Sequence, residues 1–335
     1  MFYYYQLQRF DMMIINTSLI AAVLLMMHIT LPVYGQSFVF RVLANKGDNK
    51  IKRSSGDLQK LKTGTFLNKG DQLIASADAY IGLVHKTGKT LEIRRKGTLK
   101  VEDMEKEVAA KTTSVSGRYM QYVMNRLGDD GVSDNYRKNS NVVGAAVRGS
   151  EADGIELILP VVEEKTITSY DQMMILRWIP EKGRDSLFAD QSFIVSITNL
   201  LGDELFMEET SETTIAIDLS SLDNDTELFL VKVVTRSASE EELQSVVYGI
   251  EKSSLAAKSE EVRAELSRLK AELDLSRGID RLMLAAFYEE NQMILEAMRQ
   301  YELVIKEHPD VEDYKEFYQE FLSKNQMLNI PQNSQ

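Results

Sequence analysis

Residues 61–103 read LKTGTFLNKGDQLIASADAYIGLVHKTGKTLEIRRKGTLKVED, and this stretch decides the fold of the first domain. Short apolar runs alternate with polar residues in it, which is typical of strands with one buried face. Glycine-containing turn sequences separate the runs: Asn68-Lys69-Gly70-Asp71, Lys86-Thr87-Gly88-Lys89 and Arg95-Lys96-Gly97. Short strands at this spacing predict an antiparallel all-β domain over residues 36–105.

The same stretch resembles the periplasmic FecR-like domain. The resemblance rests on Leu61-x2-Gly64-x2-Leu67-x2-Gly70-Asp71-x2-Ile74, on Ala79, Ile81 and Leu83, and on Gly88-x2-Leu91-x-Ile93. A later Ala146-Val147-Arg148-Gly149-Ser150 is similar to the family's Ala-Val-Arg-Gly-Thr element, with Ser in place of Thr. The resemblance covers about a quarter of the chain and implies a periplasmic β-domain.

A mostly apolar segment precedes this domain. Residues 12–33 read MMIINTSLIAAVLLMMHITLPV, and they are followed by Gly35 and the polar Gln36. This order is typical of a secretory signal peptide, so residues 1–35 are predicted to direct export to the periplasm or cell envelope of a bacterium. The segment is also long enough to cross a bilayer, so an uncleaved signal anchor is the alternative.

Two further regions follow the first domain. Residues 106–150 are expected to be a connector with a helix over 115–127 and a polar loop. Residues 151–236 contain about seven short apolar runs, which predict a β-sandwich. The pattern, with Trp178-x-Pro180, resembles a fibronectin type III or immunoglobulin-like module. We expect Trp178, the single tryptophan, to lie in its core.

From residue 237 the apolar period changes to that of helices. Helices are expected at 239–257, after the capping box Ser239-x-x-Glu242, at 259–277, where Gly278 would end the helix, and at 312–325. Residues 237–330 are therefore predicted to form a helical bundle. The expected fold class is a multidomain α+β protein with two β-domains followed by helices.

The stretch before the last of these helices resembles one tetratricopeptide repeat. Two alanines stand where two helices would touch, two tyrosines where a groove between helices is filled, and a proline where the second helix stops: Ala285, Ala297, Tyr288, Tyr301 and Pro309. Because one repeat does not bury its own faces, the neighbouring helices are expected to stack on it. The resemblance implies that the concave face of the helices binds a partner protein, whose identity the sequence leaves open.

Charge is divided between the regions. Residues 36–106 hold 15 Lys and Arg against 8 Asp and Glu, whereas the whole chain has a formal net charge of −12. Five basic residues beside two successive turns are predicted to gather at one end and edge of the β-structure: Lys86, Lys89, Arg94, Arg95 and Lys96. They would contact an anionic envelope component, namely lipid headgroups, lipopolysaccharide or a cell-wall polymer. A solvated face without a partner is the alternative, and we expect no nucleic-acid binding.

The sequence shows no recognisable catalytic constellation. It has no cysteine, its three histidines are widely separated, and it lacks the phosphate-binding, zinc-protease and serine-hydrolase motifs. His85 is expected to be exposed on a hairpin end, and the acidic runs 240–242 and 260–261 to lie on helix surfaces. We therefore predict a protein without enzymatic activity, cofactor or metal.

The predicted function is that of an exported scaffold or sensor that acts by contact. An unrecognised enzyme remains an alternative. A membrane-anchored regulator of the FecR type is another, but that family places a cytosolic anti-sigma segment of several dozen residues before the membrane helix. At most 11 residues precede the apolar run here, which disfavours this role.

Overall fold

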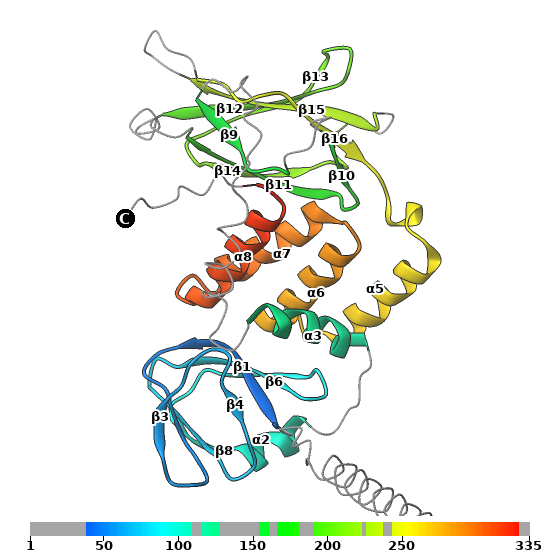
Figure 1. The fold of residues 1–335 in the computed structure, drawn as a ribbon. Coiled ribbons are helices and arrows are strands. Elements are labelled where there is room, and N and C mark those ends of the chain that lie inside the picture. The colour runs from blue at the N-terminus through cyan, green and yellow to red at the C-terminus, as the bar shows by residue number, and fades with distance from the viewer. Residues whose placement is uncertain are drawn as a thin grey trace, which may run out of the picture. The chain divides into compact units, whose positions relative to one another are not determined.

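The computed structural model describes residues 38–108, 115–127, 154–160, 166–180, 191–222, 226–236 and 243–327. Within these ranges the chain is a mixed α and β protein, in which several β-sheets precede four C-terminal helices (Figure 1). The proposed signal segment, the polar loop of the connector with Ala146–Ser150, and the capping box at Ser239 lie outside the described residues.

The first β-region contains two four-stranded sheets. Its strands are β1 (Phe40–Lys46), β2 (Lys50–Lys52), β3 (Leu58–Lys60), β4 (Phe66–Leu67), β5 (Gln72–Ala75), β6 (Tyr80–His85), β7 (Thr90–Ile93) and β8 (Gly97–Lys100). The sheet orders are β4-β1-β6-β7 and β3-β2-β5-β8, and their pairings are antiparallel as predicted. Apolar side chains from both sheets form one core, on which helix α2 (Val101–Val108) also packs.

The Gly-Asp turn predicted at Gly70-Asp71 has a clear structural role. Gly70 has φ 88°, a value that residues with a side chain rarely adopt. The buried Asp71 carboxylate accepts hydrogen bonds from the backbone N–H groups of Ser54 and Asn68, both at 3.0 Å. It also pairs with Arg53 at 2.9 Å. The turn therefore ties two loops of the β-region together.

A second β-region forms two further sheets. Its strands are β9 (Ile155–Leu157), β10 (Thr166–Ser169), β11 (Met173–Pro180), β12 (Ser192–Thr198), β13 (Glu204–Thr210), β14 (Thr214–Asp218), β15 (Leu228–Arg236) and β16 (Tyr248–Lys252). The sheet orders are β10-β16-β15-β12-β13 and β14-β11-β9. Trp178 is fully buried and its ring lies edge-on to Phe193, with centroids 5.4 Å apart. The predicted burial of Trp178 is confirmed.

The helix predicted over residues 239–257 is wrong. Strand β16 lies there instead, pairing antiparallel with β15 and parallel with β10. The physical reason is visible at Gly249, where a Cβ would come within 2.7 Å of the Thr166 hydroxyl. The short apolar run therefore uses a glycine to bring two strands close, whereas a glycine inside a helix only costs stability.

The C-terminal helices are α5 (Glu260–Glu272), α6 (Gly278–Glu290), α7 (Ile294–Glu307) and α8 (Glu312–Lys324), and α5 follows a short 3₁₀ turn, η2 (Leu255–Ala257). The Ser259 side chain caps the first turn of α5, at 3.3 Å from the N–H of Val262. The prediction that Gly278 ends a helix is wrong, because α5 ends at Glu272 and Gly278 is the first residue of α6. Its backbone N–H donates to Glu92 of β7 at 2.8 Å.

Helix α3 (Val115–Leu127) has the bounds predicted for the helix of the connector. It packs on α5 and α6, and four of its apolar side chains are buried among those of the C-terminal helices: Tyr119, Met120, Val123 and Met124. The helical unit is therefore discontinuous in sequence, because the second β-region lies between α3 and α5.

Candidate functional site

One face of the sheet β3-β2-β5-β8 carries lysines from three strands. Lys50 pairs directly opposite Lys60, and Lys52 lies opposite both Leu58 and Gln72. Gln72 in turn pairs with Lys100. Residues that pair in register point to the same side of a sheet, and the alternate residues Ile51 and Leu73 are buried in the core on the other side. The four lysines therefore share the outward face.

This lysine face, defined by Lys50, Lys52, Lys60 and Lys100, is strongly basic. The remaining outward residues of the four described strands include no carboxylate: Leu58, Gln72, Ile74 and Thr98. Lys50 lies 3.5 Å from Asp48, while Lys52, Lys60 and Lys100 are exposed. Like charges directly opposite each other, as at Lys50 and Lys60, destabilise a sheet. An anionic ligand would relieve that repulsion.

The five basic residues predicted from the sequence do not gather at one end. Lys86 and Lys89 lie in the turn before β7, whereas Arg94, Arg95 and Lys96 follow β7. The four residues of β7 separate the two groups by roughly 13 Å. Lys86 pairs with Glu105 at 3.2 Å, and Lys89 donates to the carbonyl of Val108 at 2.7 Å. Both lysines therefore hold α2 against the sheet.

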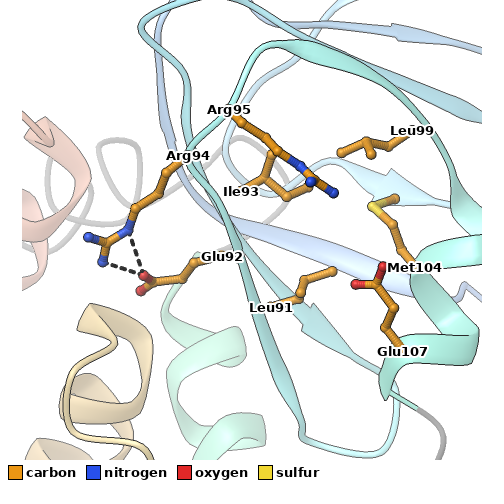
Figure 2. Close-up of a pocket in the computed structure, with 8 residues that line it drawn as sticks. All are labelled: Leu91, Glu92, Ile93, Arg94, Arg95, Leu99, Met104 and Glu107. Atoms are coloured by element: carbon orange, nitrogen blue, oxygen red, sulfur yellow. Dashed lines mark hydrogen bonds and ion pairs between the residues drawn. The ribbon is translucent and has the colours of Figure 1, made fainter.

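Arg94 and Arg95 point in different directions (Figure 2). Arg94 pairs with Glu92 at 2.6 Å and lies over the Tyr80 ring, 5.3 Å from its centroid. Arg95 extends toward Leu99 and Met104 beside a pocket of about 250 Å³ between β7, β8 and α2, which Glu107 also lines (Figure 2). Arg95 and the neighbouring Lys96 are exposed, so these two members of the predicted group are available for an anionic ligand.

His85 is buried, which corrects the exposed position expected for it. Its Nδ1 lies 2.7 Å from the Thr87 hydroxyl, and its Nε2 lies 3.8 Å from Glu105. Burial lowers the pKa of His85, and the adjacent Lys86 adds to the effect, so the ring is favoured in its neutral form. His85 is buried at the hairpin end, where Glu105 of α2 lies beside its ring.

The repeat-packing residues come together between α6 and α7. Ala285 and Ala297 are fully buried, as small residues at a close helix contact must be, and Tyr288 and Tyr301 are almost fully buried. Pro309 lies in the turn between α7 and α8, two residues after the last residue of α7. Four of the five are therefore buried in the packed pair α6–α7, whereas Pro309 is exposed in the turn that follows.

A buried polar network centred on Arg126 of α3 was not predicted from the sequence. The Arg126 guanidinium lies 2.8 Å from Glu289 of α6, 2.8 Å from the Tyr301 hydroxyl of α7 and 3.1 Å from Glu320 of α8. Burial opposes ionisation of Glu289, but Arg126, Tyr301 and Lys324 outweigh it and hold the pKa of Glu289 below its ordinary value. The network thus joins α3 to three other helices.

The sequence contains little signal for either feature. Lys50 and Lys52 flank the buried Ile51, which marks an outward-facing pair, but the pairing with Lys60 and Lys100 depends on strand register. Arg126 lies one turn after Tyr122 on a helix that also carries Arg118, Gln121 and Asn125, so its residue type and spacing do not mark it as buried.

Comparison of the chain with protein-family models gives no match, and comparison with curated proteins gives none either. None of the helices in the described ranges combines the length and apolar composition that a bilayer span requires.

Proposed function

We propose that this protein is a non-enzymatic, exported scaffold of the bacterial cell envelope, built from a FecR-like β-domain, a fibronectin type III or immunoglobulin-like sandwich and tetratricopeptide-like helices. The observation that carries the proposal is one continuous apolar cluster. It contains side chains from β1 and β6, from the second β-region and from α3 and α5–α8. A platform of this kind presents several surfaces in fixed positions.

Polar contacts join the helices to the first β-region. The carboxylate of Asp313 on α8 accepts from the backbone N–H of Asn45 at 2.8 Å, and the hydroxyls of Tyr80 and Tyr314 lie 2.6 Å apart. Thr90 donates to the buried Asp280 of α6. These groups are buried or partly buried, so separating the two parts would leave polar groups unpaired.

Helix α7 makes corresponding contacts with the second β-region. Glu296 accepts from the backbone N–H groups of Tyr170 and Asp171 at 2.6 and 2.9 Å. Arg177 of β11 pairs with Glu302 at 2.8 Å. The helices therefore hold both β-regions, which supports a scaffolding role for them.

Helix α3 changes where a partner protein could bind. In the tetratricopeptide repeats that this region resembles, the first helix of each repeat lines the concave face. Helices α6 and α8 would take those places here. Arg126 and Tyr122 of α3 contact both. We propose that α3 fills this face, so that a partner protein binds the exposed side of α5 or displaces α3.

The lysine face is the proposed contact for an anionic envelope component. Four lysines gathered from separate strands supply a broad electrostatic attraction without the fixed geometry that a small ligand needs. Arg95 and Lys96, in the loop that leads into β8, extend the basic surface beside the same sheet.

The export part of the proposal is tested by identifying the N-terminus and location of the mature protein. We expect fractionation to place the protein in the envelope, with Gln36 as its first residue. An intact apolar segment in a membrane fraction would instead support the anchored, FecR-type alternative. Recovery of the whole chain from the cytosol would contradict export.

The anionic contact is tested by co-sedimentation with anionic vesicles and with purified cell wall. Lys52→Glu/Lys100→Glu should reduce the bound fraction several-fold, because it reverses two charges of the lysine face. Binding should also weaken between 0.1 and 1 M salt, over which the Debye length falls from ~10 to ~3 Å. Arg268→Glu/Lys270→Glu, which changes two exposed residues of α5, is the matched control and should bind nearly as wild type. Equal sedimentation of all three proteins would remove the lysine face from the proposal.

A further inference from the structure

Strand β13 forms an open edge of the second β-region. It pairs with β12 alone among the described strands, and it is the last strand in the five-stranded sheet. Its seven residues therefore carry a row of backbone N–H and C=O groups that no described strand pairs. An exposed edge of this length is a template for pairing with a further strand.

Exposed apolar side chains mark the same edge. Leu200 and Leu201, at the tip of the β12–β13 hairpin, are 66% and 88% exposed, and Met207 within β13 is 56% exposed. They are three of the five large hydrophobic side chains that stand out as exposed in the described part of the chain. Solvation alone gives no reason for leucines at a hairpin tip, whereas a partner surface does.

The charge of this edge is entirely acidic. Residues 199–212 contain five carboxylates and no lysine or arginine: Asp203, Glu204, Glu208, Glu209 and Glu212. Arg236 of β15 neutralises Glu209. Like charges placed opposite each other are unfavourable, so two copies of β13 do not pair with one another. The edge therefore suits a basic strand.

The first β-region provides such a strand. β3 is the edge of the sheet β3-β2-β5-β8, and its three residues are all exposed. Leu58 is 58% exposed, Lys60 belongs to the lysine face, and Lys62 follows two residues later. This second open edge is thus basic and carries an exposed leucine, which complements β13 in both respects. The strands β3 and β13 are labelled in Figure 1.

We propose that β13 of one copy of this chain pairs with β3 of a second copy. The pairing sets the acidic strand β13 alongside the basic segment that holds Lys60 and Lys62, so that opposite charges meet along the contact. Because the two paired surfaces differ, a pair of copies retains one free edge of each kind, so the contact propagates head to tail into a ring or an open filament. β3 offers only three residues of backbone pairing, so association depends on concentration and salt. This inference does not rest on the scaffold function or on export.

Sedimentation velocity of the chain from residue 36 tests the proposal. We expect species larger than a monomer that grow with concentration at 0.1 M salt and diminish at 1 M salt. Two variants reverse one edge each: Glu204→Lys/Glu208→Lys on β13, and Lys60→Glu/Lys62→Glu at β3. Within β13 the first variant changes the charge from −3 to +1, and the second changes the charge of residues 60 and 62 from +2 to −2. Each variant alone should remain monomeric, because its two pairing strands then have the same sign.

An equimolar mixture of the two variants is the decisive arm. In the mixture every basic edge again finds an acidic one, so association should return. Glu260→Lys/Glu261→Lys, at the exposed start of α5, makes the same charge change away from both edges and should assemble as wild type. Far-UV circular dichroism and Trp178 emission verify that each variant is folded. A wild type that stays monomeric at every concentration, variants that assemble alone, or folded variants that fail to associate when mixed would each overturn the proposal.

Discussion

Gly278, the first residue of α6, packs tightly against Tyr314 of α8. A Cβ built there would lie 2.7 Å from the Tyr314 hydroxyl and 2.9 Å from two of its ring carbons. Tyr314 is fully buried and hydrogen-bonded to Tyr80, so its ring has no room to withdraw. Gly278→Ala is expected to destabilise the protein by ~1–3 kcal/mol, as overpacking of a core does.

Urea unfolding measures this loss. Gly97→Ala is the matched control, because no heavy atom lies within 4 Å of a Cβ at Gly97. We expect the control to change the free energy of unfolding by less than ~0.5 kcal/mol. Equal midpoints for the two variants would contradict the close packing described at Gly278.

Asp280 is a buried carboxyl group that should make stability depend on pH. Burial raises its pKa to about 6 from the ordinary 3.8, although the hydrogen bond from Thr90 opposes the rise. Between pH 4 and 6 the folded state therefore binds more protons than the unfolded state. The free energy of unfolding falls as pH rises through this window, by at most ~3 kcal/mol from this group, and then levels off.

The comparison of wild type with Asp280→Asn isolates this contribution. As the pH is lowered from 6.5 to 4, wild type should gain stability relative to the variant, measured by urea unfolding at each pH. Asp310→Asn serves as control, because Asp310 is exposed and its hydrogen bond and charge interaction with Lys46 hold its pKa below 3.8. A constant difference between wild type and Asp280→Asn across the window would contradict the buried carboxyl.

At the scale of elements, the packing of α3 on the C-terminal helices depends on the Arg126 side chain. Arg126→Met would leave Glu320 buried without its cation and weaken the pairing of Glu289. Breaking a buried pair in this way costs ~3–5 kcal/mol. Arg118→Met on the same helix removes exposed pairs with Glu265 and Glu290, which are worth ~0–1 kcal/mol. Thermal unfolding of the two variants should therefore differ by many degrees, and similar midpoints would contradict the network.

The same network argues against autonomous folding of residues 237–330. That fragment lacks α3 and contains β16, a strand that needs β15 as its partner. We expect the isolated fragment to show less helix by circular dichroism than its share of the full chain. A fragment that begins at residue 115 supplies both elements and should recover that share. A native-like spectrum from 237–330 alone would mean that α3 is dispensable.

Helical periodicity of the apolar residues predicted three of the helices correctly. The helix over 115–127 and the helices near 259–277 and 312–325 are present because their apolar residues recur at helical spacing over three or more turns. The helix prediction was wrong at Val246–Ile250 because so short a run of mostly apolar residues fits a strand as well as a helix. Its β-branched residues and internal glycine favour the strand. The length of the apolar pattern, more than its hydrophobicity, therefore decides whether a helix can be told from a strand.

The basic surface was misplaced for a related reason. Lys86 and Arg94 are close in sequence, but a strand lies between them, and an extended chain separates its ends. Lys60 and Lys100 are distant in sequence, but strand register brings them onto one face with Lys50 and Lys52. Proximity in sequence predicts proximity in a turn or helix, whereas in a sheet the pairing decides it.

At the scale of the whole molecule, the continuous apolar cluster predicts cooperative unfolding. Trp178 reports the second β-region, and ellipticity at 222 nm reports the helices. We expect both signals to change at one urea midpoint. Gly278→Ala should shift both midpoints equally, although Gly278 packs against Tyr314 of α8 and lies outside the β-region that holds Trp178. Two separated transitions would show that the parts unfold independently.

The discontinuous helical unit has a consequence for synthesis. Arg126 and Phe317, whose guanidinium and carbonyl meet in the folded protein, stand 191 residues apart in the chain. At ~5–20 residues per second, α3 leaves the ribosome roughly 10–40 s before its partner helix exists. During that interval the apolar side of α3 and the charge of Arg126 have no native surroundings. Factors that bind nascent chains should therefore meet this helix early, and the last helix to be made is the one that releases it.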